Sequence, residues 1–308
     1  MPLAVCYITS RQEPRIEWVC DSLRNENTKV TQIIVVDLFA DQYGRKEYFR
    51  KLAGREIDHV LPKPSVWQGV HRLTKDHWWA ASNARNTALC LARTDYVAYV
   101  DDRCVLMPGY LTHIKESIMR GRAIFGSYQK RIGMKVENGV IVKDGISEGI
   151  VDGSDTREAY LTQNQIPAPF ECPGAWSFGC NLAFPLEWAL EINGWDETCD
   201  GAGFEDPFFG IMLQNSGKKA LFYEPRMKVI QDRTSKECYP VIKKTDKGIS
   251  PNDKSHAMLD RLKAKKRATH SWDLRAIRES VLRGEPFPIP TGPTHDWYDG
   301  QPLAEMVV

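Results

Sequence analysis

The sequence predicts an α/β fold in which a mixed sheet is flanked by helices. Pro2–Thr9 and Gln32–Val36 are apolar, β-prone runs, and the segment between them has helical periodicity, which is typical of a βαβ unit. Tyr96–Val100 is a continuous apolar run of the kind that parallel sheets bury on both faces. Two carboxylates, Asp101 and Asp102, follow this run directly.

The other regular elements follow from the same periodicities. The first helix is predicted at Pro14–Arg24, where apolar residues recur every three to four positions and Pro14 suits a first turn. Further helices are expected at Tyr43–Leu52, Ala81–Arg93, Pro108–Met119, Pro185–Ile192 and Pro207–Asn215, and further strands at Ile57–Leu61, Ala123–Ser127 and Lys219–Tyr223.

Two regions depart from this alternation. Residues 129–170 contain β-prone pieces around Asn138-Gly139, a hairpin signal, and we interpret them as a small β insertion that faces the second substrate. Residues 66–80 have no clean period and are interpreted as a loop over the site. Its aromatic residues could form either an acceptor platform or a packed lid: Trp67, Trp78 and Trp79 with His71 and His77.

The net charge of the 308 residues is +1, which excludes a global field that attracts nucleic acid or anionic membranes. Positive charge gathers instead in Lys236–Arg283, with thirteen Lys or Arg against six Asp or Glu and predicted helices near Ser255–Arg267 and Trp272–Arg283. We expect a main domain at 1–235 and a basic helical extension with a flexible tail at 236–308.

The cysteines and the apolar runs bear on the compartment. The eight cysteines are scattered and form no CxxC pair, which disfavours a zinc or thioredoxin site. No apolar run approaches the roughly 18 residues of a membrane helix. The simplest expectation is a protein of the reducing cytoplasm.

Asp101 and Asp102 lie where open α/β sheets bind ligands, in the crevice beyond the carboxyl ends of the strands. Adjacent carboxylates repel each other, so a nearby metal ion or arginine would relieve them. A metal-bridged diphosphate is a natural ligand for such a site. The structural alternative is a strand followed by an Asp-rich turn.

Four segments in order carry a family resemblance: Val5–Arg11 with Ile33–Asp37, Ala84–Leu89, Tyr99–Arg103 with Pro108–Leu111, and Gly194–Glu197 followed by Gly203–Asp206. Together they resemble a GT-A fold glycosyltransferase of the family 2 type. The last segment is also similar to the C-terminal motif of polypeptide GalNAc-transferases and galactosyltransferases. The resemblance implies a Rossmann-like domain that binds a nucleotide-sugar at the carboxyl ends of its strands.

The resemblance also implies a nucleotide-sugar site, made by Thr9, Arg11, Asp37, Arg85, Asn86, Asp101, Asp102 and Arg103. The first three would surround the base and ribose, and Arg85 or Asn86 would lie near the nucleotide. Asp101 and Asp102 would hold the ribose or a divalent metal on the diphosphate. Mn²⁺ or Mg²⁺ would act there as a Lewis acid on the departing nucleotide.

One position departs from the family pattern. The third residue of the Asp-X-Asp motif is Arg103 here, and arginine cannot ligate a metal, although it could pair with diphosphate oxygens. The histidine that often completes the metal site is also missing, and Gln231 or Asp232 stands in that region.

Glu205 and Asp206 resemble the acidic pair of the family. The resemblance implies that Asp206 takes the proton of the acceptor hydroxyl as general base and that Glu205 binds the acceptor, in a single displacement with inversion. The structural alternative is that Asp206, which precedes Pro207, caps a helix. Trp176 and Trp195 could stack on sugar faces or pack in the core.

We therefore expect an inverting glycosyltransferase that uses a nucleotide-diphosphate sugar, first of all a UDP-sugar, and a glycan or lipid-linked acceptor. One alternative is the same chemistry on a hydroxymethylated nucleic-acid base or nucleotide, which the basic run Lys263–Arg267 would suit. A second alternative is a non-catalytic nucleotide-sugar-binding domain, which Arg103 would favour. The donor sugar, the acceptor and the oligomeric state do not follow from the sequence.

Overall fold

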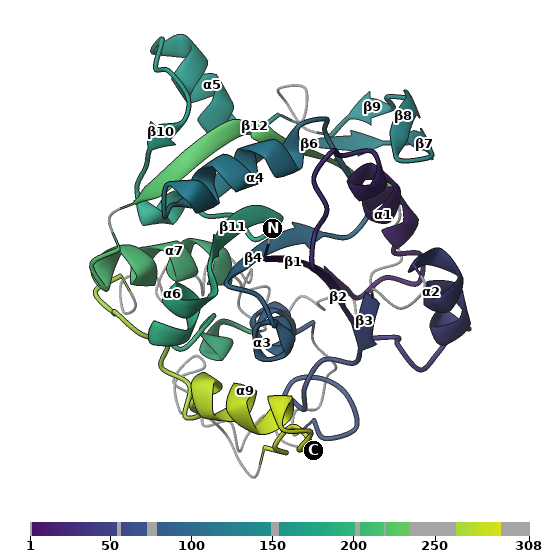
Figure 1. The fold of residues 1–308 in the computed structure, drawn as a ribbon, viewed down its shortest axis with the longest axis vertical. Coiled ribbons are helices and arrows are strands. Elements are labelled where there is room, and N and C mark those ends of the chain that lie inside the picture. Colours follow the sequence, from purple (N-terminus) through teal and green to yellow (C-terminus); the bar gives the residue numbers. More distant parts are fainter. Residues whose placement is uncertain are drawn as a thin grey trace, which may run out of the picture.

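The computed structural model describes residues 2–53, 57–72, 79–148, 154–200, 204–218, 220–234 and 263–290. One large sheet runs through them in the order β10-β12-β6-β11-β4-β1-β2-β3, with β5 and β9 paired at its side (Figure 1). The strands are β1 (Leu3–Thr9), β2 (Gln32–Asp37), β3 (Ile57–Val60), β4 (Tyr96–Asp101), β5 (Cys104–Leu106), β6 (Ala123–Ile132), β9 (Ile146–Ser147), β10 (Phe170–Glu171), β11 (Asn181–Pro185) and β12 (Leu221–Asp232).

The sheet is mixed, which confirms the predicted α/β class. β1 pairs in parallel with β2 and β4, and β2 pairs in parallel with β3. β11 is antiparallel to both β4 and β6, so it separates the parallel half from the parallel pair of β6 and β12. The carboxyl ends of β1 and β4 therefore meet at one edge, where α/β sheets bind ligands.

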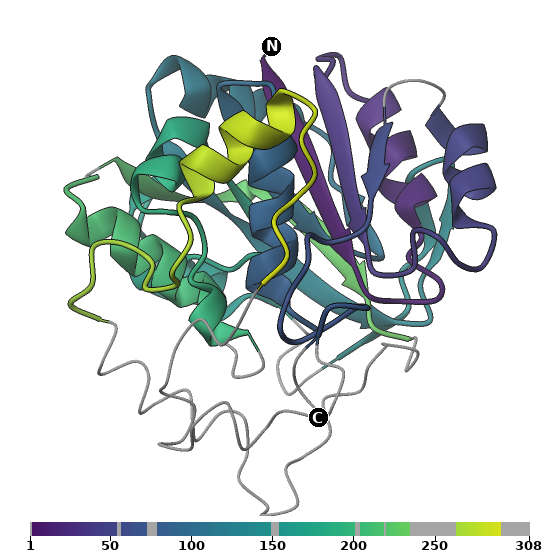
Figure 2. The ribbon, with the colours of Figure 1, turned by 90° about the horizontal axis from the view of Figure 1, so that it is seen from below.

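Helices cover both faces of the sheet (Figures 1 and 2). On one face lie α1 (Ile16–Arg24), α2 (Arg45–Ala53) and α4 (Tyr110–Met119), and on the other lie α3 (Ala81–Leu91), α6 (Leu186–Glu191), α7 (Glu205–Asn215) and α9 (Leu274–Leu282). Successive β1 residues alternate between the two cores, because strand side chains alternate in direction. Among the described helices, none is long and apolar enough to cross a membrane.

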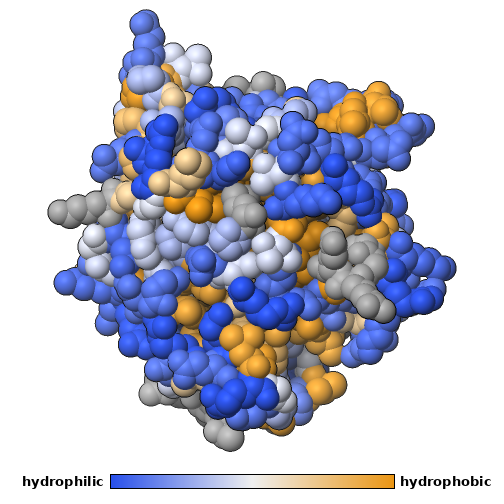
Figure 3. All heavy atoms as spheres, in the orientation of Figure 1, coloured by the Kyte–Doolittle hydropathy of each residue, from blue (hydrophilic) through white to orange (hydrophobic). Residues whose placement is uncertain are grey.

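The predicted insertion contains a hairpin and a helix. β7 (Lys135–Glu137) and β8 (Val140–Lys143) pair around Asn138-Gly139, both with positive φ, as the turn signal predicted. Gly139 approaches the backbone of α1 so closely that a Cβ would overlap the Ser22 nitrogen. The insertion also holds α5 (Thr156–Gln163), and its hairpin region exposes apolar side chains such as Val140 and Ile146 (Figure 3).

Some boundaries differ from the predictions for local reasons. The first helix begins at Ile16, after the left-handed residue Arg15, so Pro14 precedes the helix. The strand expected at Lys219–Tyr223 continues to Asp232, because a bulge between Glu224 and Lys228 absorbs Pro225. This continuation carries Gln231 and Arg233 toward the ligand-binding edge of the sheet.

The C-terminal helix is part of the same folded unit. α9 fulfils the prediction at Trp272–Arg283, and its residues Leu274 and Ile277 are buried in the core that contains α3. The Ala268 amide also donates to the Ile192 carbonyl. Residues 263–290 therefore pack on the main domain. The division of the chain at residue 235 stays a prediction. Most of the other helix expected there, Ser255–Arg267, and the tail beyond residue 290 lie outside the described residues.

Candidate active site

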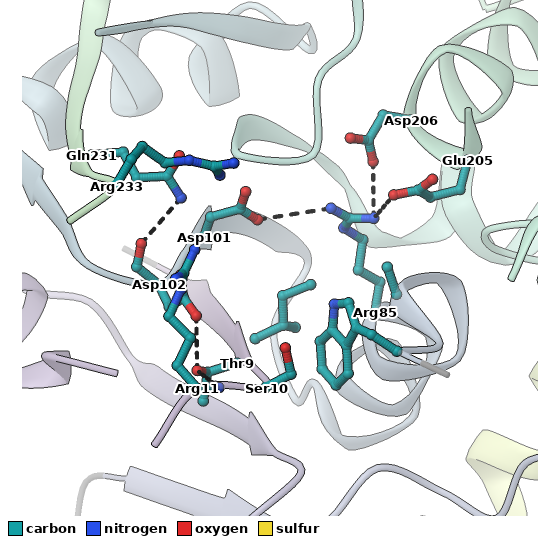
Figure 4. Close-up of a pocket in the computed structure, with 13 residues that line it drawn as sticks. Thr9, Ser10, Arg11, Arg85, Asp101, Asp102, Glu205, Asp206, Gln231 and Arg233 are labelled. Atoms are coloured by element: carbon teal, nitrogen blue, oxygen red, sulfur yellow. Dashed lines mark hydrogen bonds and ion pairs between the residues drawn. The ribbon is translucent and has the colours of Figure 1, made fainter. Parts of the chain in front are cut away.

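A cavity of about 280 Å³ opens at the carboxyl ends of β1 and β4 (Figure 4). Asp101 lines it from the end of β4, and Asp206 lines it from the first turn of α7. Two distant parts of the chain therefore contribute acids to one pocket. Its charged lining residues are Arg11, Arg85, Arg233, Asp101, Asp102, Glu205 and Asp206.

Asp102 is bound on both of its oxygens. Thr9 Oγ1 donates to Asp102 Oδ2 at 2.9 Å, and Arg11 Nε donates to Asp102 Oδ1 at 2.8 Å. Burial raises the pKa of Asp102, and the Arg11 guanidinium opposes this shift. Asp102 therefore anchors the loop after β1, while Asp101 keeps 29% of its side chain exposed toward the cavity.

Arg85 joins the two acidic pairs. It projects from α3, and its Nη1 lies 3.0 Å from Glu205 Oε1 and 2.9 Å from Asp206 Oδ1. Its Nη2 lies 3.8 Å from Asp101 Oδ1. Burial alone would lower the pKa of Arg85, but Asp206, Glu205 and Asp101 raise it, so the guanidinium stays charged. One cation thus ties the end of β4 to the start of α7.

The Asp206 carboxyl is basic for an aspartate. Burial raises its pKa to about 7, aided by Glu205 and Asp101 and opposed by Arg85 and by a hydrogen bond from the Gly179 amide. Gly179 packs closely against both side chains, since a Cβ there would overlap Arg85 Nη2 and Asp206 Oδ1 unless those side chains shifted. The helix is preceded by Phe204 in the left-handed conformation, so Asp206 lies inside the first turn and does not cap it.

The acidic loop before α7 is fastened to α3. Asp200 accepts the amides of Ser82 and Asn83, at 2.7 and 3.0 Å, in the first turn of α3. Asn86 donates to Glu197 Oε1 at 2.7 Å and to the Trp195 carbonyl at 2.8 Å. These contacts fix the loop that leads to Asp206 against the helix that carries Arg85.

Several residues expected in the site lie elsewhere. Asp37 is fully buried, where its carboxylate accepts the Phe39 amide and lies 3.2 Å from His59 Nε2, so it does not line the cavity. Asn86 is likewise fully buried and serves the loop contacts above. Both were placed near the nucleotide by position in the family motif, Asn86 as an alternative to Arg85, and their own hydrogen-bond partners hold both side chains away from the cavity wall. Their contact with the nucleotide stays a prediction.

Trp176 and Trp195, the two tryptophans expected to contact the sugar, do not line the cavity. Trp195 has no exposed surface and stacks on Phe209 with ring centroids 4.0 Å apart, so the expected sugar contact is corrected to core packing. Trp176 is half-buried and packs edge-on against Tyr223 and Tyr160. Trp79 does line the cavity, Trp67 is buried, and His77 and Trp78 lie outside the described residues.

Sequence comparison identifies the family of the chain. The glycosyl transferase family 2 profile matches residues 5–177, more than half of the chain. The chain belongs to glycosyl transferase family 2. The match includes Arg85 and Asp101, whereas Glu205 and Asp206 lie beyond it. No curated protein sequence matches the chain.

Structural comparison agrees with the GT-A fold of this family. A crystal structure of GalNAc-T7 with UDP, GalNAc and Mn²⁺ is 14% identical, with a TM-score of 0.57, and is aligned over 93% of this chain and 59% of that one. A structure of S. aureus TarS with UDP-GlcNAc is 13% identical, with a TM-score of 0.48, over 78% of this chain and 61% of that one. This chain spans about three fifths of the length of each.

The donor set does not fit the metal site that the family pattern implies. Arg103 stands in the third position of the motif and pairs with Asp232 at 2.5 Å. Both oxygens of Asp102 are taken, and Gln231 donates to the Asp102 carbonyl. Among the described residues, no three His, Cys, Asp or Glu side chains gather as metal ligands. Only Asp101 of the two expected ligands keeps an available carboxylate.

Sequence reasoning missed Gly179 and Arg233. Gly179 gave no signal, because its close neighbours are two side chains that are distant in sequence. Trp79 was placed in the loop over the site, as part of an acceptor platform or a packed lid, and it lines the cavity. Arg233 follows Gln231 and Asp232, which were considered only as possible replacements for a metal-binding histidine.

Proposed function

We propose that the chain is an inverting glycosyltransferase that moves a sugar from a nucleotide-diphosphate sugar, in the first instance a UDP-sugar, to an acceptor hydroxyl. The observation that carries this proposal is the shared cavity of Asp101 and Asp206, bridged by Arg85. The family assignment supports glycosyl transfer, and the acidic pair supplies the base that an inverting reaction requires.

In the proposed reaction, the acceptor oxygen attacks the anomeric carbon of the donor. The bond between that carbon and the diphosphate oxygen breaks, and its electron pair leaves with the nucleoside diphosphate. The hydroxyl proton passes to a carboxylate oxygen of Asp206, whose raised pKa suits a base near neutral pH. Because attack comes from the face opposite the leaving group, one displacement inverts the anomeric centre.

The neighbouring residues orient this base. Arg85 holds the carboxylates of Glu205 and Asp206 on one nitrogen, so the two acids keep a fixed spacing. Glu205 keeps 17% of its side chain exposed on the cavity wall. Its carboxylate can there accept a hydrogen bond from another hydroxyl group of the sugar acceptor. Mn²⁺ or Mg²⁺ stays a prediction from the resemblance.

The test is a panel of α-linked nucleotide-sugars followed by proton NMR. The enzyme should release nucleoside diphosphate from one donor even without acceptor, and the first free sugar to appear should be the β-anomer. Release of the α-anomer would refute inversion. Absence of both hydrolysis and transfer across the panel, with nucleotide binding intact, would favour a non-catalytic binding domain.

The nucleic-acid alternative has no support in the described residues. Residues 236–262, which carry much of the basic region, lie outside them. In the described run 263–267, Asn215 Nδ2 donates to the Lys263 and Lys265 carbonyls, so part of this run serves packing against α7. Glycan, lipid-linked and nucleotide acceptors are distinguished by transfer assays with the donor that the panel identifies.

A further inference from the structure

The three arginines of the cavity differ in where their partners lie. Arg11 pairs with Asp102, and Arg85 pairs with Glu205, Asp206 and Asp101, all of which line the cavity. Arg233 pairs with Glu148, whose carboxylate lies outside the cavity wall. Among the described lining residues, Arg233 is thus the arginine whose ion pair is made with a carboxylate outside the cavity wall.

The Arg233 side chain is also the most accessible of the three. It is 37% exposed, against 6% for Arg11 and 4% for Arg85. Its Nε lies 3.5 Å from Glu148 Oε2, and the Glu148 side chain is 39% exposed. The pair is long and both side chains are more than a third exposed, so it contributes little. An incoming polyanion can therefore take the guanidinium from Glu148. Figure 4 shows that Arg233 lies over the cavity beside Asp101.

The backbone beneath Arg233 is held firmly. Arg103 Nη2 lies 2.5 Å from Asp232 Oδ2, and the Asp232 amide donates to the Arg103 carbonyl at 2.9 Å. The Arg233 amide donates to the Arg131 carbonyl at 2.7 Å. Arg103 has a left-handed backbone and a side chain that is 6% exposed. It therefore fixes the end of β12 and does not reach into the cavity.

We propose that Arg233 binds the donor diphosphate directly, at the place where the family pattern implies a metal ion, and that Arg103 positions it through Asp232. This proposal rests on the proposed function, because it takes a nucleoside diphosphate as the ligand. The proposal gives Arg103, in the third position of the acidic motif, a role. A metal ligand is lost at this position, and Arg103 instead holds Asp232 and thereby the neighbouring Arg233 in place.

The chemistry of the ligand agrees with this assignment. A diphosphate accepts paired hydrogen bonds from a planar guanidinium, and such charge-assisted contacts are strong. The negative charge of Asp101 alone would repel the diphosphate. Burial raises the pKa of Asp101, and Arg85 and Arg233 oppose this shift. When Arg233 binds the leaving group, it also neutralises the charge that grows on the diphosphate as the sugar departs.

The test is calorimetric titration with UDP and UMP, in chelator and in Mn²⁺. The wild-type protein should bind UDP more tightly than UMP by about ten- to hundredfold, the usual value of a charge-assisted contact, and the chelator should leave this ratio unchanged. Arg233→Met should lose the preference for UDP while UMP binding persists. The matched control is Arg93→Met, which removes an arginine of a similar exposed ion pair, with Asp58, away from the cavity.

A second variant keeps the result interpretable. Glu148→Gln removes the competing carboxylate and should tighten UDP binding by up to about threefold, as expected from the small strength of an exposed pair. Wild-type loss of the UDP preference in chelator, or an Arg233→Met variant that keeps it, would overturn the proposal. If the wild-type protein binds no nucleotide at all, the proposed function itself fails, which separates the two outcomes.

Discussion

Two pairs of adjacent acidic residues line the cavity, Asp101 with Asp102 and Glu205 with Asp206. The two pairs carry the same number of carboxylates but have different neighbours. In the pair at the end of β4, Asp102 is bound by Thr9 and Arg11, while Asp101 faces the cavity. In the pair at the start of α7, Glu205 and Asp206 share one nitrogen of Arg85. All four acids line the cavity, but in the first pair the two members have separate partners, whereas in the second pair they share one.

The backbone explains the difference. β4 ends at Asp101, so Asp102 lies in the turn that follows, where Thr9 and Arg11 from the end of β1 bind its carboxylate. Adjacent side chains of a helix are separated by only about 100°, so two acids in a first turn can reach the same cation. A run of two acids in a sequence therefore has a different meaning at a strand end and at a helix start.

The largest expected effect is on Asp206. Asp206→Asn removes the proposed base, and sugar transfer should fall by about 10²- to 10⁴-fold, as is typical for the loss of acid–base catalysis. The measurement is kcat for transfer or donor hydrolysis. Glu205→Gln is the matched comparison on the same helix turn, and it should raise the KM for acceptor more than it lowers kcat. Equal losses in both variants would contradict the division of roles between them.

The next effect concerns stability and separates the members of the other pair. Asp102→Asn leaves Arg11 buried beside an uncharged partner and should cost about 3 kcal/mol of unfolding free energy, a typical value for a broken buried ion pair. Asp101→Asn should change stability by less than about 1 kcal/mol, since its side chain is partly exposed and 3.8 Å from Arg85. Denaturant titration measures both. A reversed order would mean that Asp102, and not Asp101, is the ligand-facing acid.

The smallest effect is the dependence on pH. Asp206 must be deprotonated to act as a base, so kcat/KM should fall about tenfold per pH unit below its pKa of about 7. For stability the sign is the opposite: the raised pKa means that the folded state favours the protonated form, so stability declines as the pH rises from the ordinary aspartate value toward 7. Asp206→Asn should flatten both profiles. An acid limb that persists in that variant's residual activity would assign the limb to another group.

Much of the fold could be predicted because its signals are local. The apolar runs of β1, β2 and β4 and the Asn138-Gly139 turn each carry their own pattern, and all are present. β5 was missed, because Cys104–Leu106 is short and follows the acids directly. The length of β12 was missed because Pro225 suggests a strand end, and only the pairing with β6 around a bulge shows that the strand continues.

Site residues could be predicted where a motif fixes the position of the backbone. The prediction failed where distant packing partners decide which way a side chain points. Asp101 and Asp206 follow from their places at a strand end and a helix start. Asn86 and Trp195 also belong to the family segments, yet the Asn86 side chain donates to the Trp195 carbonyl and the Trp195 side chain is buried in the core. The sequence pattern specifies which residues stand near a site, whereas long-range packing decides which of them face it.

The seat of α9 on α3 has a practical consequence for protein production. A shortened chain that ended at residue 234 would lack Leu274 and Ile277, which pack on the helix that carries Arg85. Their loss would expose a hydrophobic surface to water. Such a fragment should precipitate or bind chaperones, although it would retain every charged residue of the cavity.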